Sequence, residues 1–169
     1  MILVTVGTHG MPFDRLLRSL DAPAVVAALD PEPLVVQAGT SRYVCRRARQ
    51  FPYCPRAELD TLLREADLVI SHGGIGTLLP AVRQGKHVIA IPRLAAHGEH
   101  NDDHQVEICA ELARQGALLT STDVADLPDL LGRDRAALRP FAPPSTVAAS
   151  IRTELAAFER VLARRAARR

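Results

Sequence analysis

The sequence predicts an α/β fold: a mainly parallel β-sheet with helices on both faces. Apolar strand-like runs alternate with amphipathic helical patterns along the chain, which is the order typical of a parallel sheet. The strand-like runs are apolar throughout rather than at every second residue, which indicates that both faces of the sheet are buried. Gly85 and Gly116 follow two of the helical patterns, where a left-handed glycine commonly ends a helix.

Six segments have strand-like composition, the third of them only weakly. They are Ile2–Val6, Leu34–Ala38, Phe51–Tyr53, Asp67–Ser71, His87–Ile91 and Ala117–Thr120. Four segments between them carry apolar residues at helical spacing. These are Asp14–Leu20, Arg56–Ala66, Thr77–Gln84 and Asp102–Gln115. In a sheet built this way, ligands bind at the carboxyl ends of the strands.

The length of 169 residues suits one domain with a core of its own. We expect residues 1–144 to form that domain and residues 145–169 to form a C-terminal helix with a basic tail. Apolar residues recur there at helical spacing: Val147, Ile151, Leu155, Phe158 and Leu162. The helix either packs on its own domain or forms part of a partner interface, and the basic tail either contacts anionic lipid or is solvated.

Composition narrows the class of protein. The net charge of +2 is too small to indicate a nucleic-acid partner. The three cysteines, Cys45, Cys54 and Cys109, are odd in number and lack C-x-x-C spacing, which favours reduced thiols in a cytoplasmic protein. The chain starts on a strand-like run, and no apolar run approaches the roughly 20 residues of a spanning helix. We therefore expect a soluble or peripheral protein.

A glycine-rich turn is the strongest functional signal. The run Ser71-His72-Gly73-Gly74-Ile75-Gly76-Thr77 follows an apolar strand-like segment and leads into a helical pattern. A helix N-terminus offers free N–H groups and about half a unit of positive charge. Glycines let an anion approach the backbone closely. The turn therefore predicts a phosphate or diphosphate ligand, held by the residues His72, Gly73, Gly74, Gly76 and Thr77.

A second turn, Gly7-Thr8-His9-Gly10, follows the first strand-like run. Its small residues Gly7, Thr8 and Gly10 lie at the carboxyl end of a strand, as the first turn does. Two such turns facing one crevice favour a diphosphate held between them. The pattern is neither the P-loop G-x-x-x-x-G-K-[ST] nor a G-x-G-x-x-G after the first strand, which disfavours a P-loop NTPase and an NAD-binding unit.

A third loop, residues 92–105, gathers three histidines and three carboxylates. His100 and His104 are four residues apart and could hold a metal from one helical face, although Asn101 stands where a zincin has glutamate. Asn101 or Asp102 could instead cap the next helix. A loop that presents donors and acceptors to a polyhydroxyl ligand explains more of these residues than either alternative, and we expect no metal site.

Four stretches together resemble a known family. Ser71–Thr77, Pro92-Arg93, Gly98-Glu99-His100 and Asp103-His104-Gln105 are similar to the C-terminal, nucleotide-sugar-binding half of GT-B glycosyltransferases of the MurG-like family 28. Over roughly residues 1–120, with Val4-Thr5-Val6-Gly7-Thr8 as the first matching stretch, the chain resembles the stand-alone subunits of split enzymes. These are the eukaryotic donor-binding subunit of the dolichol-linked UDP-GlcNAc transferase and the bacterial PssE-type exopolysaccharide subunits; the third loop favours the latter. The implied fold is Rossmann-like.

The resemblance implies a UDP-sugar donor, no other cofactor and no obligatory metal. The two glycine turns would hold the diphosphate. Arg93, Asp103, His104 and Gln105 would contact the donor, with Asp103 and Gln105 on sugar hydroxyls. His9, Glu99 and His100 are the candidate catalytic residues. Many relatives carry a glutamate for the ribose where this chain has Pro80, so this contact is in question here.

The resemblance also implies a second chain, because a complete GT-B enzyme has another domain that binds the acceptor. We expect a membrane-anchored acceptor-binding subunit that recruits this protein to the inner face of the plasma membrane. The reaction would be inverting transfer of a hexose to a polyprenyl-diphosphate-linked saccharide, in exopolysaccharide or capsule synthesis. A non-catalytic accessory subunit that enhances a partner transferase is one alternative, and a metal-dependent hydrolase that uses the histidine loop is another.

Overall fold

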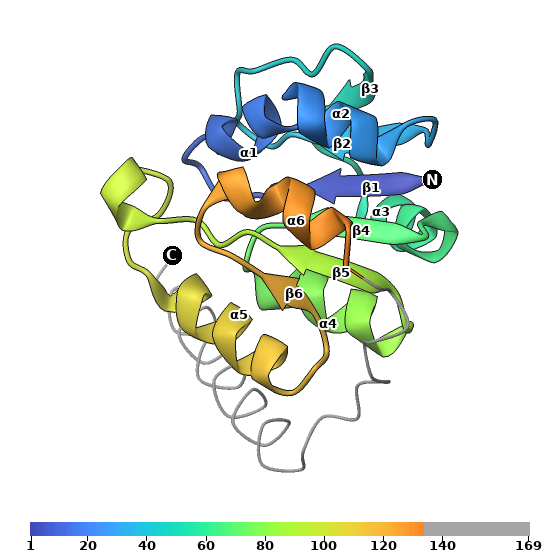
Figure 1. Ribbon diagram of the computed structural model, residues 1–169. Helices are drawn as coiled ribbons and strands as arrows, with labels where there is room; N and C mark the ends of the chain where they lie inside the picture. The colour runs from blue at the N-terminus through green and yellow to red at the C-terminus, as the bar shows by residue number, and fades with distance from the viewer. Residues whose placement is uncertain (134–169) are drawn as a thin grey trace.

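The computed structural model describes residues 1–133, which form a six-stranded sheet in the order β3-β2-β1-β4-β5-β6 (Figure 1). The strands are β1 (Ile2–Thr5), β2 (Leu34–Gln37), β3 (Ala48–Phe51), β4 (Leu68–Ser71), β5 (His87–Ala90) and β6 (Leu119–Thr120). Every neighbouring pair is parallel. This order is the Rossmann-like one, and it confirms the predicted α/β fold.

Helices cover both faces of the sheet (Figure 1). The helices are α1 (Asp14–Ser19), α2 (Pro23–Leu29), α3 (Arg56–Glu65), α4 (Ile75–Arg83), α5 (His104–Arg114) and α6 (Leu127–Leu131), with short 3-10 turns η1 (Ala95–His97) and η2 (Val124–Asp126). One core cluster joins the sheet to α1, α2 and α6. A second cluster joins it to α3, α4 and α5.

The strands explain why the apolar runs have no alternation. Ile2 and Val4 of β1 lie in the cluster under α1, α2 and α6, whereas Leu3 lies in the opposite cluster. Successive side chains of a strand point to opposite faces, so a sheet covered on both sides needs an apolar residue at each position. The predicted glycine ends are also confirmed, since Gly85 and Gly116 have φ of +68° and +73° after α4 and α5.

Three elements differ from the sequence prediction. Helices α2 and α6 were not predicted. They are only seven and five residues long, and each has a proline at its first or second position. Proline in a sequence indicates a turn or a break, although a helix tolerates it in the first turn. Strand β3 is Ala48–Phe51 rather than Phe51–Tyr53. It is an edge strand that carries Arg49 and Gln50 and is not fully buried, so it lacks the apolar signal of the inner strands.

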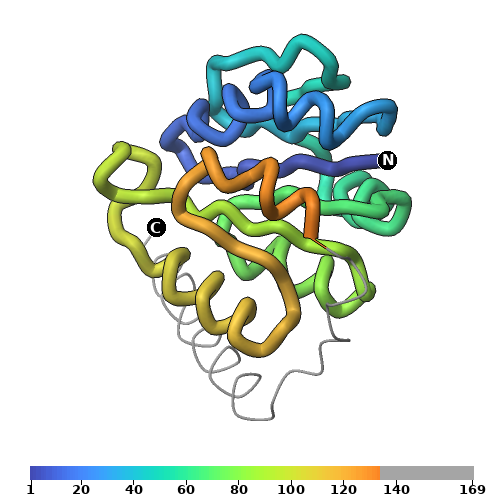
Figure 2. The backbone as a smooth tube through the Cα atoms, viewed as in Figure 1, coloured from blue at the N-terminus to red at the C-terminus, as the bar shows by residue number. Residues whose placement is uncertain are grey.

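The sheet order determines where a ligand site forms. The chain runs from β1 to β2 and β3 on one side and then returns to β4, β5 and β6 on the other. The order therefore reverses between β1 and β4, and ligands bind outside the carboxyl ends of strands at such a point. Figure 2 shows the segment around η1, in yellow-green, beyond the carboxyl ends of the strands.

Two further predictions concern the C-terminal segment and the absence of a membrane-spanning helix. The C-terminal helix over residues 145–169, and the domain boundary before it, lie outside the described residues. Within residues 1–133, no helix combines the length and apolar character needed to cross a bilayer.

Candidate functional site

The two glycine turns meet on either side of the His72 side chain. A Cβ atom placed on Gly7 would lie 2.5 Å from the Nε2 atom of His72, and one placed on Gly74 would lie closer still. Gly7 also has φ of +77°, a conformation that other residues rarely adopt. Both positions therefore require glycine, and the imidazole fills the space between the β1 and β4 turns.

His72 is held as a neutral imidazole. Its Nδ1 atom lies 3.3 Å from the carbonyl oxygen of Thr5, which can only accept a hydrogen bond, so we assign the proton to Nδ1. The Nε2 atom then faces the two glycines. Burial, followed by the charge of Arg93, lowers the pKa of His72 to about 4.

Buried amides hold the backbone of the two turns. The Gly7 N–H donates to Oε1 of Gln37 at 3.2 Å, and Nε2 of Gln37 donates back to the Gly7 carbonyl at 3.0 Å. The Gly73 N–H donates to Oε1 of Gln105 at 3.0 Å. These two N–H groups are therefore occupied within the fold. Gly74 caps α4 without a side-chain bond, so the first-turn amides of Ile75 and Gly76 are the ones a helix leaves for an anion.

A pocket of about 390 Å³ lies over these turns, within the size range of small-molecule sites. It is lined by Thr5, Gly7, Thr8, Gln37, Tyr53, Cys54, Arg56, Leu59, His72, Gly76 and Thr77. A wider hollow of about 630 Å³ among α1, α2, η2 and α6 includes none of the predicted site residues. The pocket that contains predicted residues is thus the one at the carboxyl ends of β1 and β4.

Arg93 lies inside the fold and is fully buried. Its guanidinium donates to the carbonyl oxygens of Val6 and Met11 at 2.8 Å and of Glu99 at 2.9 Å, and it packs over the Phe13 ring. Burial lowers the pKa of Arg93, although the nearby Glu99 charge opposes this. Arg93, which was predicted to contact the donor, joins the β1 turn to the third loop in this fold.

Glu99 and Gln105 also have structural partners. The Glu99 carboxylate is buried and forms two bonds of 2.9 Å with the Arg15 guanidinium, and it accepts the Leu94 N–H at 3.0 Å. Gln105 is buried too, and its Oε1 accepts from both Gly73 and Arg93 backbone N–H groups. Glu99 is therefore an ion-pair partner in this fold, and Gln105 supports the glycine turn from below.

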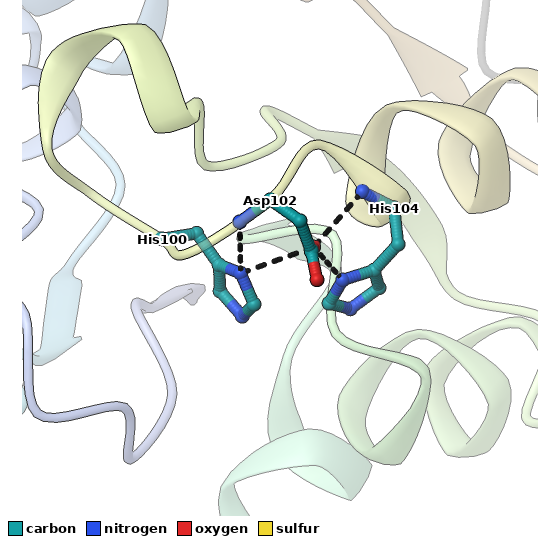
Figure 3. A group of neighbouring side chains, drawn as sticks. All are labelled: His100, Asp102 and His104. Carbon is teal, nitrogen blue, oxygen red and sulfur yellow. Dashed lines mark hydrogen bonds and ion pairs between the residues drawn. The ribbon is translucent and has the colours of Figure 1, made fainter.

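Three histidines gather at the rim of the site. The His9 and His100 rings stack with centroids 4.4 Å apart, and the His100 and His104 rings meet edge-on at 4.7 Å. Burial, followed by the charges of His100 and Arg93, lowers the pKa of His9. Asp102 lies between His100 and His104 (Figure 3), and its bond from His104 lowers the Asp102 pKa. In this cluster the His104 imidazole is exposed, and those of His9 and His100 are half-buried.

Most of the predicted residues fall into three groups. Gly7, Thr8, His72, Gly76 and Thr77 line the pocket, with Gly73 and Gly74 beside them. Arg93, Glu99 and Gln105 are buried supports. His9, His100 and His104 form the ring cluster. Gly10 is exposed, and Asp103, also exposed, accepts the Ala95 N–H at 2.8 Å.

Sequence reasoning missed several lining residues. Thr5 and Gln37 sit within strands β1 and β2, where they were counted only as parts of apolar runs. Tyr53, Cys54 and Arg56 follow β3. A correct placement of β3 would have brought its carboxyl end, and hence Tyr53, to the same edge as the glycine turns. Asp102 was considered as a helix cap and as one of the three carboxylates of the third loop.

The chain is similar in sequence to curated proteins that share the name of one transferase subunit in different organisms. The chain is 44% identical over 135 residues to the UDP-N-acetylglucosamine transferase subunit ALG13 of Yarrowia lipolytica, covering 73% of this chain and 65% of that protein. It is 31% identical over 127 residues to the mouse (Mus musculus) protein of the same name, covering 70% of this chain and 10% of that one. The match therefore spans less than two thirds of either relative.

Solved structures share the fold. The glycosyltransferase SnogD from Streptomyces nogalater superposes with a TM-score of 0.54 at 26% identity, over 82% of this chain and 36% of that chain. The solution structure of ALG13 superposes with a TM-score of 0.58 at 18% identity, over 84% and 89% of the two chains. A family model for the glycosyltransferase family 28 C-terminal domain matches residues 1–137. The chain therefore belongs to the glycosyltransferase family 28 C-terminal domain family.

Proposed function

We propose that this protein is the donor-binding, catalytic subunit of a two-component inverting glycosyltransferase that uses a UDP-sugar. The observation that carries the proposal is the pocket where the β1 and β4 glycine turns meet around His72. Its place at the reversal of strand order is where nucleotides bind in open α/β sheets. The similar UDP-N-acetylglucosamine transferase subunits support a UDP-sugar as donor.

The α4 end of the pocket is suited to the diphosphate. The N-terminus of a nine-residue helix directs amides and a partial positive charge at the ligand, and Thr8 and Thr77 line the same space. During transfer the bond between the sugar and the β-phosphate breaks, and the departing UDP gains negative charge. Donors that are already in place stabilise this charge without reorganisation. No metal is needed for this role.

The β3 end of the pocket is suited to the nucleoside. Tyr53, Cys54 and Leu59 line it, with Arg56 at the start of α3. Tyr53 is 48% exposed, so its ring face is available for stacking. Pro80 lies inside α4 and offers no carboxylate for the ribose, so we assign the ribose to groups of this end of the pocket.

The acceptor hydroxyl must lose its proton as it attacks the anomeric carbon. Glu99 is paired with Arg15, which leaves His9 and His100 as candidate bases on this chain. Both lie in the ring cluster beside the β1 turn, and the lowered pKa of His9 keeps it neutral and able to accept a proton at pH 7. Asp103 and His104, both exposed at the start of α5, would contact the donor sugar.

The remaining half of the enzyme would be a partner chain. We assign to it the binding of a polyprenyl-diphosphate-linked saccharide, the anchoring to the membrane and the recruitment of this protein to its inner face. The word "subunit" in the relatives' names supports a second chain. The third loop supports a hexose transfer in exopolysaccharide or capsule synthesis, through its resemblance to PssE-type subunits.

Donor binding tests the proposal directly. UDP at about 100 times its dissociation constant should stabilise the folded protein by about 2.7 kcal/mol, measured as a rise in Tm against an ADP control. A protein that only enhances a partner transferase would show no shift with UDP or any UDP-sugar, and that result would exclude the donor-binding role. Transfer activity is then measured with the partner present and EDTA added.

A further inference from the structure

A second group of side chains lies outside the pocket and has no part in diphosphate binding. His100, Asp102 and His104 each offer one ligand atom, and these atoms all lie within 4.8 Å of one another. Figure 3 shows the two imidazoles on either side of the carboxylate. His100 precedes α5, which begins at His104. The two rings therefore meet across Asp102 rather than on one helical face, the arrangement considered from the sequence.

The spacing fits a small tetrahedral ion. Bonds of about 2.0–2.1 Å place two ligands of such an ion about 3.3 Å apart. Nδ1 of His100 lies 3.3 Å from Oδ1 of Asp102. Nδ1 of His104 is in close contact with the same oxygen, and an ion would replace the proton between them, as metal binding displaces protons from its ligands. The His100–Asp102 separation thus already matches, whereas the His104 ring would have to move away from Oδ1 of Asp102 to admit an ion.

The Nδ1 lone pair of His100 points toward Asp102. Its Nδ1 atom accepts a hydrogen bond from the Asp102 N–H at 3.3 Å, so this nitrogen is unprotonated, the form that binds metals. The His9 ring stacks on the His100 ring at 4.4 Å and the His104 ring meets it edge-on at 4.7 Å, which restrains its orientation. His100 therefore presents a lone pair toward Asp102 before any ion arrives.

The segment that carries the three ligands is held at both ends. Glu99, directly before it, is bound by Arg15. Asp103 accepts the Ala95 N–H at 2.8 Å, and Gln105 is tied to the glycine turn. The side chains of Asp102 and His104 are 62% and 49% exposed, so an ion can enter from solvent and keep water at an open coordination position.

We propose that His100, Asp102 and His104 form a binding site for one divalent first-row transition metal ion of the Zn²⁺ class. Two imidazole nitrogens and one carboxylate oxygen suit Zn²⁺, Ni²⁺ or Cu²⁺, whereas Mg²⁺ and Ca²⁺ favour oxygen ligands. Three protein ligands leave at least one position open to water. The site is argued from the geometry of this cluster and not from donor binding, but a bound ion would occupy His100 and His104, which would leave His9 as the candidate base on this chain.

The test is a Zn²⁺ titration of the metal-free, full-length protein at about pH 7.5, where imidazole is largely neutral. Calorimetry should show one ion per chain. His104→Ala should weaken the affinity by at least about tenfold, because loss even of an outer-shell partner typically costs 10–100-fold. His97→Ala is the matched control, since His97 lies in η1 outside the cluster, and it should bind as the wild type does. Excess Mg²⁺ should not compete.

Two further measurements test the site independently of His104→Ala. If His104→Ala loses its circular-dichroism signature, Asp102→Asn at an exposed carboxylate replaces it and should also weaken binding. Co²⁺ in place of Zn²⁺ should give the visible bands of nitrogen and oxygen ligands without a thiolate charge-transfer band. Equal Zn²⁺ affinity in wild type and ligand variants, or a thiolate band from Cys54, would overturn the site. UDP binding is not used in any arm, so its failure would not affect this result.

Discussion

The two glycine turns and the third loop follow neighbouring strands of one sheet edge, yet they use their residues differently. In the turns around Gly7 and Gly74, anion binding was expected from backbone N–H groups, and residues of both turns line a pocket. In the third loop, ligand contacts were expected from side chains, and three of these, Arg93, Glu99 and Gln105, are buried with hydrogen-bond partners in the fold. Polar residues gathered near a site thus include those that hold the site in place, and burial distinguishes the two uses.

Arg93→Met gives the largest expected effect. The substitution leaves the carbonyl oxygens of Val6, Met11 and Glu99 without their donor and the buried Glu99 with one cationic neighbour fewer. Breaking such a buried charged network costs about 3–5 kcal/mol, measured as the loss in free energy of unfolding in urea. Asp103→Asn, at the exposed end of the same loop, should change this free energy by less than about 0.5 kcal/mol. Similar losses in both variants would contradict the division of the loop.

The second-largest expected effect is that of Gly74→Val, in the glycine turn between β4 and α4. The new side chain would overlap the His72 ring, so the fold should lose about 1–3 kcal/mol through overpacking and UDP affinity should fall at least tenfold. Gly76→Ala serves as the stability control in the same turn, because its Cβ would meet nothing within 4 Å. Unchanged UDP affinity in a folded Gly74→Val protein, measured by calorimetry, would argue against an anion site between the turns.

Gln105→Ala tests the link between the two regions. The sequence resemblance placed Gln105 on sugar hydroxyls, which predicts weaker sugar discrimination with UDP binding intact. In the structure its Oε1 accepts from the buried Gly73 and Arg93 amides, so removal should cost about 1–3 kcal/mol of stability and weaken UDP itself through the glycine turn. Affinities for UDP and for two UDP-sugars separate these outcomes: a loss confined to the sugar part would return Gln105 to a direct contact.

The smallest expected change for a single step of the experiment, about 1 kcal/mol for each pH unit, is a dependence of stability on pH through His72. Its pKa in the folded state, about 4, is below the usual value near 6.5, so the unfolded chain binds more protons between these values. The stability contributed by neutral His72 is thus present above about pH 6.5 and is lost as the pH falls toward about 4, by about 1 kcal/mol per unit. His72→Gln should flatten this slope in urea unfolding at about pH 7, 6 and 5; parallel slopes in both proteins would place the titration elsewhere.

Much of the fold was predictable from sequence because its signals are local. Apolar runs located five of the six strands, and Gly85 and Gly116 located two helix ends. Strand β3 was misplaced because an edge strand lacks the apolar signal of a buried one. Helices α2 and α6 were missed because each is short and has a proline at its start, which indicates a break. Pairing with β2 and packing on the sheet define these elements.

The sequence by itself determined the parallel α/β architecture and the two glycine turns, because strand burial and a helix start after glycine depend on residues next to one another. Only the tertiary structure decided what each polar side chain does. Arg93 bonds Val6 across 87 residues, and Glu99 bonds Arg15 across 84. Such pairs form only after the sheet brings the loops together, so the same residue types can support a site, contact a ligand or, as at His100, Asp102 and His104, surround a place for an ion.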